Sequence, residues 1–228
     1  MRKDRLRGIK IVYEDREVLV VDKPPRLLTI GTDKERENTA YYILTDYVRK
    51  GCLKSRNRIF IVHRLDRDTS GLVVFAKNER AKLFLQHQWD KTEKRYFAVV
   101  HGMFAEKSGT ITTYLTENKE RVVHSTSDAS IGKLSTTTYE VLKEAKGYSL
   151  LNINLVTGRK NQIRVHLAEK GHPVAGDKKY GKKDDGHKRL TLHAYLLSFI
   201  HPFSGKRMTF KTEIPAYFTG IIERCPLV

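Results

Sequence analysis

Asp66 is the residue of this sequence best placed to do chemistry. It lies in the charged segment 63–71, between two apolar runs, with Arg64 and Arg67 as close neighbours. A carboxylate can act as a nucleophile or as a base, and arginines around it would attract an anionic substrate that the carboxylate alone would repel. The same composition would also suit a plain turn, in which the carboxylate accepts backbone N–H groups and the arginines face solvent. The residue types alone leave both interpretations open.

The apolar runs on either side predict the elements that hold this segment. Residues 59–62 and 72–76 are typical of short buried strands. Earlier in the chain, residues 9–13 and 17–21 predict a β-hairpin, and the spacing over 39–50 predicts a helix with Thr39 as its N-cap. The remaining predicted elements are a helix from the Asn78 cap to about residue 89, strands at 94–100, 110–115, 120–125, 134–144 and 148–156, a short helix near 160–170, and strands at 190–200 and 206–212.

The order of these elements favours an α+β fold. Strands outnumber helices and often follow one another directly, which predicts a mixed, mainly antiparallel central sheet flanked by helices. The chain has 228 residues, of which 39% are hydrophobic, and this apolar content excludes a wholly disordered chain. The only cysteines, Cys52 and Cys225, match no disulfide framework or metal-ligand spacing. We therefore expect a protein of a reducing cytoplasm, and no apolar run is long enough to predict a membrane span.

The positive charge of the chain is concentrated in three segments. The formal net charge is +17, from 43 Lys+Arg against 26 Asp+Glu. Residues 1–10 contain 5 basic and 1 acidic residue, residues 49–95 contain 13 and 5, and residues 158–189 contain 10 and 4. The rest of the chain is close to neutral. Such a distribution predicts a polyanionic partner, and the absence of a basic amphipathic helix favours nucleic acid over a membrane surface.

Four stretches of the sequence, in order, resemble motifs of the RluA-type pseudouridine synthases. Residues 63–72 (HRLDRDTSGL) resemble the signature HRLD-x-x-TSG-L. Residues 20–25 (VVDKPP) resemble the family's opening strand followed by KP, and residues 94–102 (KRYFAVVHG) resemble its K-x-Y-x-A-x-V-x-G strand. The fourth stretch comprises TGRKNQIRVHL at 157–167, GHPVAGD at 171–177, YG at 180–181 and LHA at 192–194. The resemblance covers nearly the whole chain.

This resemblance implies a fold, a reaction and a site. The fold would be the pseudouridine synthase fold, and the reaction would isomerise a specific uridine of ribosomal large-subunit RNA or tRNA, with no cofactor. Asp66 would start the reaction as nucleophile or base, Tyr96 would hold the uracil or relay a proton, and Arg164 would pair with Asp66. Arg64 would enter the base stack in place of the flipped uridine. The further residues expected to contact RNA are Arg67, Arg159, Lys160, Lys178, Lys179 and Lys182.

The resemblance also implies how the chain is organised. We expect a single catalytic domain over residues 1–228, with about 9–215 matching the family, acting as a monomer. We expect no S4-like N-terminal RNA-binding domain, so that RNA affinity comes from the catalytic domain itself. Two positions depart from the family pattern: Asn161 stands where a histidine is usual, and Arg26 stands where a glycine is usual.

Three alternatives to this function can be weighed from the sequence. A catalytically silent RNA-binding or ribosome-assembly protein would not need Asp66, Tyr96 and Arg164 together. A nucleobase glycosylase or glycosidase is less favoured, because a retaining glycosidase needs two carboxylates at a set separation. A uridine C5-methyltransferase would need a nucleophilic cysteine in a suitable setting. We expect no metal site, since the three most suggestive histidines share no helical face; they are His63, His166 and His193.

Overall fold

The computed structural model describes residues 6–33, 35–50, 52, 54–182 and 184–223. The residues outside this description include Gly51, which directly follows the predicted helix 39–50, Lys183, and the first five residues of the basic N-terminal segment. The chain forms two compact units, the first of residues 1–92 and 196–212 and the second of residues 93–195 and 213–228. Among the described residues, no helix has the length and apolar character needed to cross a membrane.

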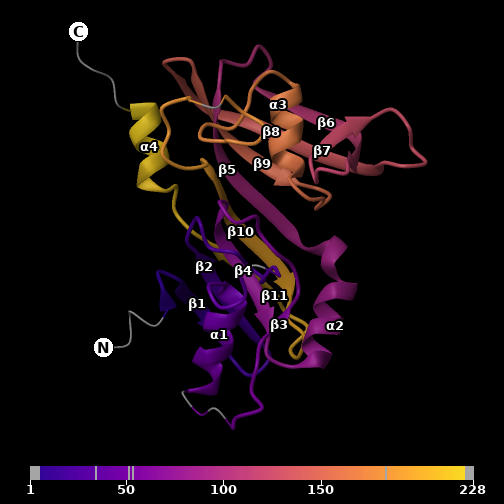
Figure 1. Ribbon diagram of the computed structural model, residues 1–228, viewed down its shortest axis with the longest axis vertical. Coiled ribbons are helices and arrows are strands. Elements are labelled where there is room, and N and C mark those ends of the chain that lie inside the picture. The colour runs from indigo at the N-terminus through magenta and orange to yellow at the C-terminus, as the bar shows by residue number, and fades with distance from the viewer. Residues whose placement is uncertain (1–5, 34, 51, 53, 183, 224–228) are drawn as a thin grey trace. The chain divides into compact units, whose positions relative to one another are not determined.

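The first unit is built on the predicted hairpin (Figure 1). Strands β1 (Lys10–Glu14) and β2 (Val18–Lys23) pair antiparallel, and β2 pairs antiparallel with β4 (Ser70–Ala76). The short β3 (Phe60–Ile61) lies on β4, and β10 (Leu192–Ile200), whose last residues belong to this unit, pairs with β11 (Arg207–Lys211). Proline at positions 24 and 25 ends β2, because proline cannot continue the ladder.

The helices of the first unit begin at the predicted caps. In α1 (Ala40–Arg49), the hydroxyl of Thr39 accepts the Tyr42 N–H at 3.2 Å. In α2 (Glu79–His87), the side chain of Asn78 accepts the Ala81 N–H at 2.8 Å, and a 3-10 turn, η2 (Trp89–Lys91), follows. Each cap satisfies one of the backbone donors that a helix start leaves without an intrahelical partner.

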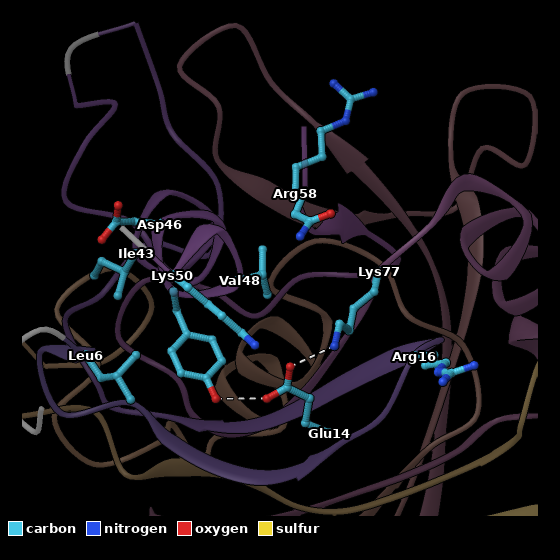
Figure 2. Close-up of a pocket in the computed structure, with 11 residues that line it drawn as sticks. Leu6, Glu14, Arg16, Ile43, Asp46, Val48, Lys50, Arg58 and Lys77 are labelled. Carbon is cyan, nitrogen blue, oxygen red and sulfur yellow. Dashed lines mark hydrogen bonds and ion pairs between the residues drawn. The ribbon is translucent and has the colours of Figure 1, made fainter. Parts of the chain in front are cut away.

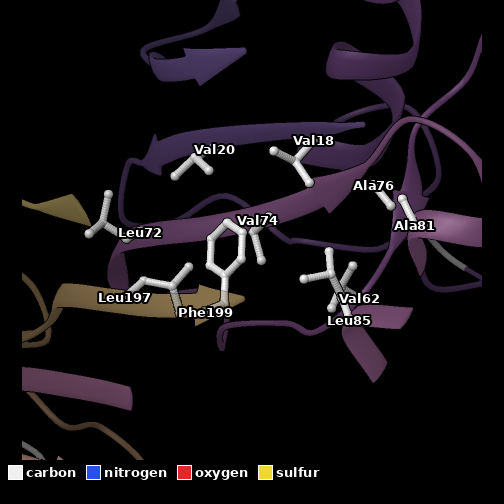
Figure 3. Packing of buried hydrophobic residues seen from close by; sticks show 10 residues of the cluster. All are labelled: Val18, Val20, Val62, Leu72, Val74, Ala76, Ala81, Leu85, Leu197 and Phe199. Atoms are coloured by element: carbon white, nitrogen blue, oxygen red, sulfur yellow. The ribbon is translucent and has the colours of Figure 1, made fainter. Parts of the chain in front are cut away.

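A continuous apolar core joins α2 to the sheet of the first unit. Figure 3 shows Val18 and Val20 of β2, with Leu72 and Val74 of β4, facing the same cluster. The other members come from the β3 region, the end of β4, α2 and β10: Val62, Ala76, Ala81, Leu85, Leu197 and Phe199. All seven residues of β4 are buried, so the strand that directly follows the Asp66 segment is a rigid support for it.

The second unit is a larger antiparallel sheet. Its strands are β5 (Glu93–His101), β6 (Ser108–Glu117), β7 (Val123–Thr126), β8 (Lys133–Ala145) and β9 (Tyr148–Leu155), in the order β5-β9-β8-β6-β7. The helix α3 (Gln162–Glu169) buries Val165 against Leu115 and Val123. The first residues of β10 also belong to this unit. With mainly antiparallel strands and flanking helices, the predicted α+β fold is confirmed.

One helix of the second unit, α4 (Ala216–Glu223), was not predicted from the sequence. It is short, and it buries Phe218 and Ile222 in a cluster with Phe97, Val99, Leu150 and Ala175. Pro215, which directly precedes it, is a helix-start signal that could have revealed it.

Candidate active site

Asp66 lies where the sequence predicted it, in the loop that leads into β4. Its side chain is half-buried, whereas Arg64 and Arg67 on either side are exposed. Thr69 and Ser70, which close the loop, are buried. The loop thus presents two guanidinium groups to solvent around a carboxylate that is only partly accessible.

The backbone on both sides of Asp66 is held by residues from a different part of the first unit. The hydroxyl of Thr29 accepts the Leu65 N–H at 3.2 Å and donates to the Leu65 carbonyl at 2.9 Å. On the other side, the ammonium of Lys23 donates to the Arg67 carbonyl at 3.2 Å. At the start of the loop, the Val74 N–H donates to Nε2 of His63 at 3.1 Å. Asp66 therefore sits on a backbone that is fixed immediately before and after it, as a reacting group requires.

Lys23, the last residue of β2, supports this loop, and no role was predicted for it from the sequence. Its side chain is fully buried, and its ammonium also donates to the carbonyls of Pro24 at 3.0 Å and Leu27 at 2.8 Å. Burial lowers the pKa of Lys23 to about 8, although the charges of Asp68, Asp66 and Asp22 oppose this shift. Lys23 thus places a positive charge beneath the loop and links the end of β2 to it.

The two departures from the family pattern both lie at left-handed backbone positions. Arg26 has φ of +65° and Asn161 has φ of +53°. Glycine adopts this conformation at little steric cost, which explains why a glycine would suit position 26, and asparagine tolerates it better than most residues. At position 161 the chain therefore uses a residue that fits the backbone.

Arg164 is held by a carboxylate of its own unit. On α3, its Nε and Nη2 atoms donate to the two oxygens of Asp177, each at 2.7 Å. Asp177 also accepts the N–H groups of Lys179 at 2.9 Å and Tyr180 at 3.0 Å. Burial alone would raise the pKa of Asp177, but the hydrogen bonds and charge of Arg164, together with these N–H groups, lower it below its usual range. Sequence reasoning missed Asp177 as an Arg164 partner, although it is the Asp of the quoted GHPVAGD stretch.

Asn161 and Tyr180 complete this arrangement. The Asn161 side-chain amide donates to the Tyr180 hydroxyl at 2.9 Å, and Nη1 of Arg164 approaches the Asn161 oxygen at 3.3 Å. The guanidinium carbon of Arg164 lies 5.1 Å from the centre of the Tyr180 ring. Arg164 is therefore fixed by a bidentate ion pair and by an aromatic face, which leaves its guanidinium little freedom to reorient.

Tyr96 lies in the middle of β5 of the second unit. It pairs with Ile153 of β9, and its side chain is almost completely buried, at 8% exposure. A strand paired along its length gives this ring a defined position.

Most of the predicted RNA-contacting residues of the second unit are exposed; they are Arg159, Lys178, Lys179 and Lys182. Lys160 is partly engaged, because its ammonium forms an ion pair with Glu117. The loop with the three exposed lysines is tied down by Asp177 at its start and by Asp185 near its end. Asp185 accepts the N–H groups of Gly176 at 2.6 Å and His187 at 3.0 Å and contacts Nε2 of His101 at 3.0 Å.

The three histidines considered as possible ligands have structural surroundings. His63 accepts a backbone N–H, as described above, and stacks near Trp89 with ring centres 4.4 Å apart. His166 is fully buried, with its ring nitrogens 3.0 Å from the hydroxyls of Thr137 and Thr113. Burial lowers the pKa of His193 to about 4, and the charge of Arg189 acts in the same direction.

The predicted site residues thus form two groups. Arg64, Asp66 and Arg67 share one loop of the first unit. The second unit contains Tyr96 on β5, Arg164 on α3, and the exposed basic residues of the segment 158–182.

Comparison with known proteins identifies the family. A family profile described as RNA pseudouridylate synthase matches residues 17–169, a range that includes the Asp66 loop, β5 and α3. The chain belongs to this family. RNA pseudouridylate synthases are isomerases that convert uridine in RNA to pseudouridine, so the predicted enzyme class is confirmed. The predicted assignment to the RluA-type pseudouridine synthases is confirmed as well.

Similar pseudouridine synthases occur in several bacteria. An uncharacterised RNA pseudouridine synthase of Bacillus subtilis is 36% identical over 94% of this chain and 72% of its own length. The ribosomal large subunit pseudouridine synthase C of Buchnera aphidicola from Acyrthosiphon pisum is 34% identical over 94% of this chain and 70% of its own length.

The solved structures confirm the pseudouridine synthase fold. Human RNA pseudouridylate synthase domain containing 4 superposes with a TM-score of 0.77 at 20% identity, covering 94% of this chain and 92% of that chain. Human RNA pseudouridylate synthase domain containing 1 has a TM-score of 0.74 at 26% identity, covering 92% of this chain and 85% of that chain.

Proposed function

We propose that this pseudouridine synthase isomerises a specific uridine in structured large-subunit ribosomal RNA, with Asp66 as the group that starts the reaction. The observation that carries the proposal is the fixation of the Asp66 backbone from both sides, by Thr29 at Leu65 and by Lys23 at Arg67. A plain surface turn does not need such support from buried side chains. The choice of ribosomal RNA is supported by relatives named ribosomal large subunit pseudouridine synthase C and D.

In the proposed reaction, the N1–C1′ bond of the uridine breaks, the uracil turns in the site, and C5 bonds to C1′. The proton at C5 is lost and N1 gains a proton, so that the product is an isomer of the substrate and no redox partner or group donor is consumed. Asp66 acts either by attack on C1′ or as a base toward the sugar. Tyr96 holds the uracil or relays a proton, since its ring is fixed in β5.

Arg164 has the proposed role of orienting the Asp66 carboxylate. The bidentate pair with Asp177 occupies its Nε and Nη2 atoms and sets the plane of its guanidinium group. Asp177 and Tyr180 are therefore positioning residues for Arg164 in this scheme.

Arg64 has the proposed role of filling the stack that the target uridine leaves. A paired uridine does not expose its C1′ and C5 atoms to a side chain, so the base must flip out at a cost of a few kcal/mol. The exposure of Arg64, two residues from Asp66, supports this role. The phosphate contacts are assigned to Arg67, Arg159, Lys160, Lys178, Lys179 and Lys182.

The experiment that tests the proposal is incubation of the purified protein with unmodified large-subunit ribosomal RNA and, separately, with unmodified tRNA. Pseudouridine is then mapped at nucleotide resolution. We expect one or a few modified uridines in the ribosomal RNA. Modification of tRNA alone would identify tRNA as the substrate, and release of free uracil would identify a glycosylase. Tight RNA binding without any change in the RNA would identify a silent binding protein.

A further inference from the structure

A cavity in the first unit lies away from the Asp66 loop. It has a volume of about 710 Å³ and is bounded by α1, the end of β1 and the segment that leads to β3. Strand β4 begins after the Asp66 loop and ends one residue before Lys77. Its length places the cavity about 20 Å from the start of that strand, at a rise of about 3.3 Å per residue.

One carboxylate of the cavity lining, Glu14, is already paired within the protein. Glu14 forms an ion pair with Lys77 at 2.7 Å and accepts the Tyr47 hydroxyl at 2.8 Å. Burial opposes ionisation, but these two hydrogen bonds and the charges of Lys77 and Lys50 lower the pKa of Glu14. Glu14 is therefore already compensated within the protein, and its negative charge does not determine what the cavity attracts.

The rim of the cavity carries cations that are not compensated in this way. Among the residues that the structure describes, Arg16 and Arg58 form no ion pair, and each is exposed. Figure 2 shows Arg16 and Arg58 extending outward on different sides of the Glu14–Lys77 pair, with Lys50 directed toward it. Over the whole lining, the four cations Arg16, Lys50, Arg58 and Lys77 stand against two carboxylates, Glu14 and Asp46. The rim therefore favours an anion.

Two further features indicate which anion fits. Lys54 and Arg56, between Lys50 and Arg58 in the chain, are also exposed, so the positive surface continues beyond the rim. The cavity also has apolar lining, from Leu6, Ile43 and Val48. An apolar wall beside exposed guanidinium groups suits a nucleotide, whose base can contact the wall while its phosphate contacts the cations.

We propose that this cavity is a second RNA-binding site, which holds a phosphate-bearing nucleotide of the substrate RNA outside the target loop. The inference rests on the proposed function of the enzyme in RNA and extends it to a surface that no motif of the sequence marks. RNA affinity should then depend on RNA length, because only an RNA that reaches about 20 Å beyond the end of the Asp66 loop can occupy both sites.

The test compares two double variants of the full chain. In Arg16→Gln/Arg58→Gln, two rim cations become neutral side chains that keep hydrogen-bonding groups. The matched control is Lys206→Gln/Lys211→Gln, which removes the same charge from two exposed lysines of the first unit that lie outside the three basic segments. The probe is a fluorescein-labelled RNA stem-loop, and its Kd is measured by anisotropy at several salt concentrations.

We expect the rim variant to lose about 2 from the slope of log K against log salt, because each phosphate contact contributes about 1. Its affinity deficit relative to wild type should then shrink about 12-fold between about 50 and 200 mM salt, whereas the control should keep the wild-type slope. On an RNA shortened to the loop alone, the rim variant and wild type should have the same slope.

Equal slopes for the rim variant and wild type on the long stem-loop would overturn the proposal. Labelled poly-glutamate serves as a second probe. If the rim variant lost binding to poly-glutamate but bound RNA like wild type, the cavity would be assigned to an acidic peptide and the proposal would be overturned. Pseudouridine formation by the wild-type protein is measured separately. Its absence would refute the proposed function, while the slope comparison would still report on the cavity.

Discussion

The buried ammonium of Lys23 offers a sharp test of how the Asp66 loop is held. In Lys23→Met the chain keeps an unbranched apolar side chain of similar length but loses three hydrogen bonds to the carbonyls of Pro24, Leu27 and Arg67. A hydrogen bond from a charged group contributes about 1.5–3 kcal/mol, so the loss of these three costs about 6 kcal/mol. The lowered pKa of Lys23, about 8 against the ordinary 10.5, means that the wild-type protein pays about 3 kcal/mol to keep the charge buried.

The substitution removes this electrostatic cost, so we expect the free energy of unfolding to fall by about 3 kcal/mol net. Urea denaturation at pH 7 measures it. Lys10→Met is the matched control, because Lys10 is an exposed lysine on β1 opposite Asp22, and its loss should change the free energy of unfolding by less than about 0.5 kcal/mol. Single-turnover rates of folded Lys23→Met should also fall, because the Arg67 carbonyl is no longer held.

The same lysine predicts a pH dependence. Between pH 8 and 10.5 the unfolded state binds more protons at Lys23 than the folded state, so the Lys23 contribution to the free energy of unfolding rises as the pH increases through this window. In Lys23→Met this rise should be missing. An unfolding free energy within 0.5 kcal/mol of wild type at pH 7, or an identical pH profile in both proteins, would refute the role assigned to Lys23.

Three further perturbations test other parts of the site. Arg164→Lys keeps the charge but cannot bind both oxygens of Asp177, so the single-turnover rate should fall by about tenfold or more while the RNA Kd changes little. An equal loss of RNA binding would instead make Arg164 a phosphate contact. Arg64→Ala should slow the reaction more on a paired target uridine than on an unstructured one, and equal losses with a salt slope lower by about 1 would contradict the stacking role. His193 binds a proton near pH 6.5 in the unfolded state but only near pH 4 in the folded state, so lowering the pH through this window should reduce the free energy of unfolding by about 3 kcal/mol. Urea denaturation of His193→Gln should lack this component, and a pH profile identical to that of wild type would contradict it.

Much of the local structure could be predicted from the sequence, because it depends on residues close together in the chain. The Thr39 and Asn78 caps, the opening hairpin and the strands around the Asp66 loop are all set by spacing and turn chemistry. The helix α4 was missed because its stability comes from packing Phe218 and Ile222 into a core formed by distant strands.

The supporting residues of the site could not be predicted in the same way. The role of Lys23 depends on its complete burial and on a carbonyl 44 residues away, which tertiary packing creates. Asp177 lies beyond the end of α3, and nothing in its spacing from Arg164 corresponds to a helical or strand neighbour. Sequence motifs identified these segments, but only the structure gives the hydrogen bonds by which they hold one another.

The role of Asp66 in starting the isomerisation is measured by tritium release from 5-tritiated uridine in RNA under single-turnover conditions. Asp66→Asn removes one charge without changing the side-chain volume, and Asp68→Asn makes the same change two residues away in the same loop, at an exposed position. We predict no release with Asp66→Asn at unchanged RNA affinity, and release close to the wild-type rate with Asp68→Asn. Release by Asp66→Asn at a rate near wild type would exclude Asp66 as the group that starts the reaction.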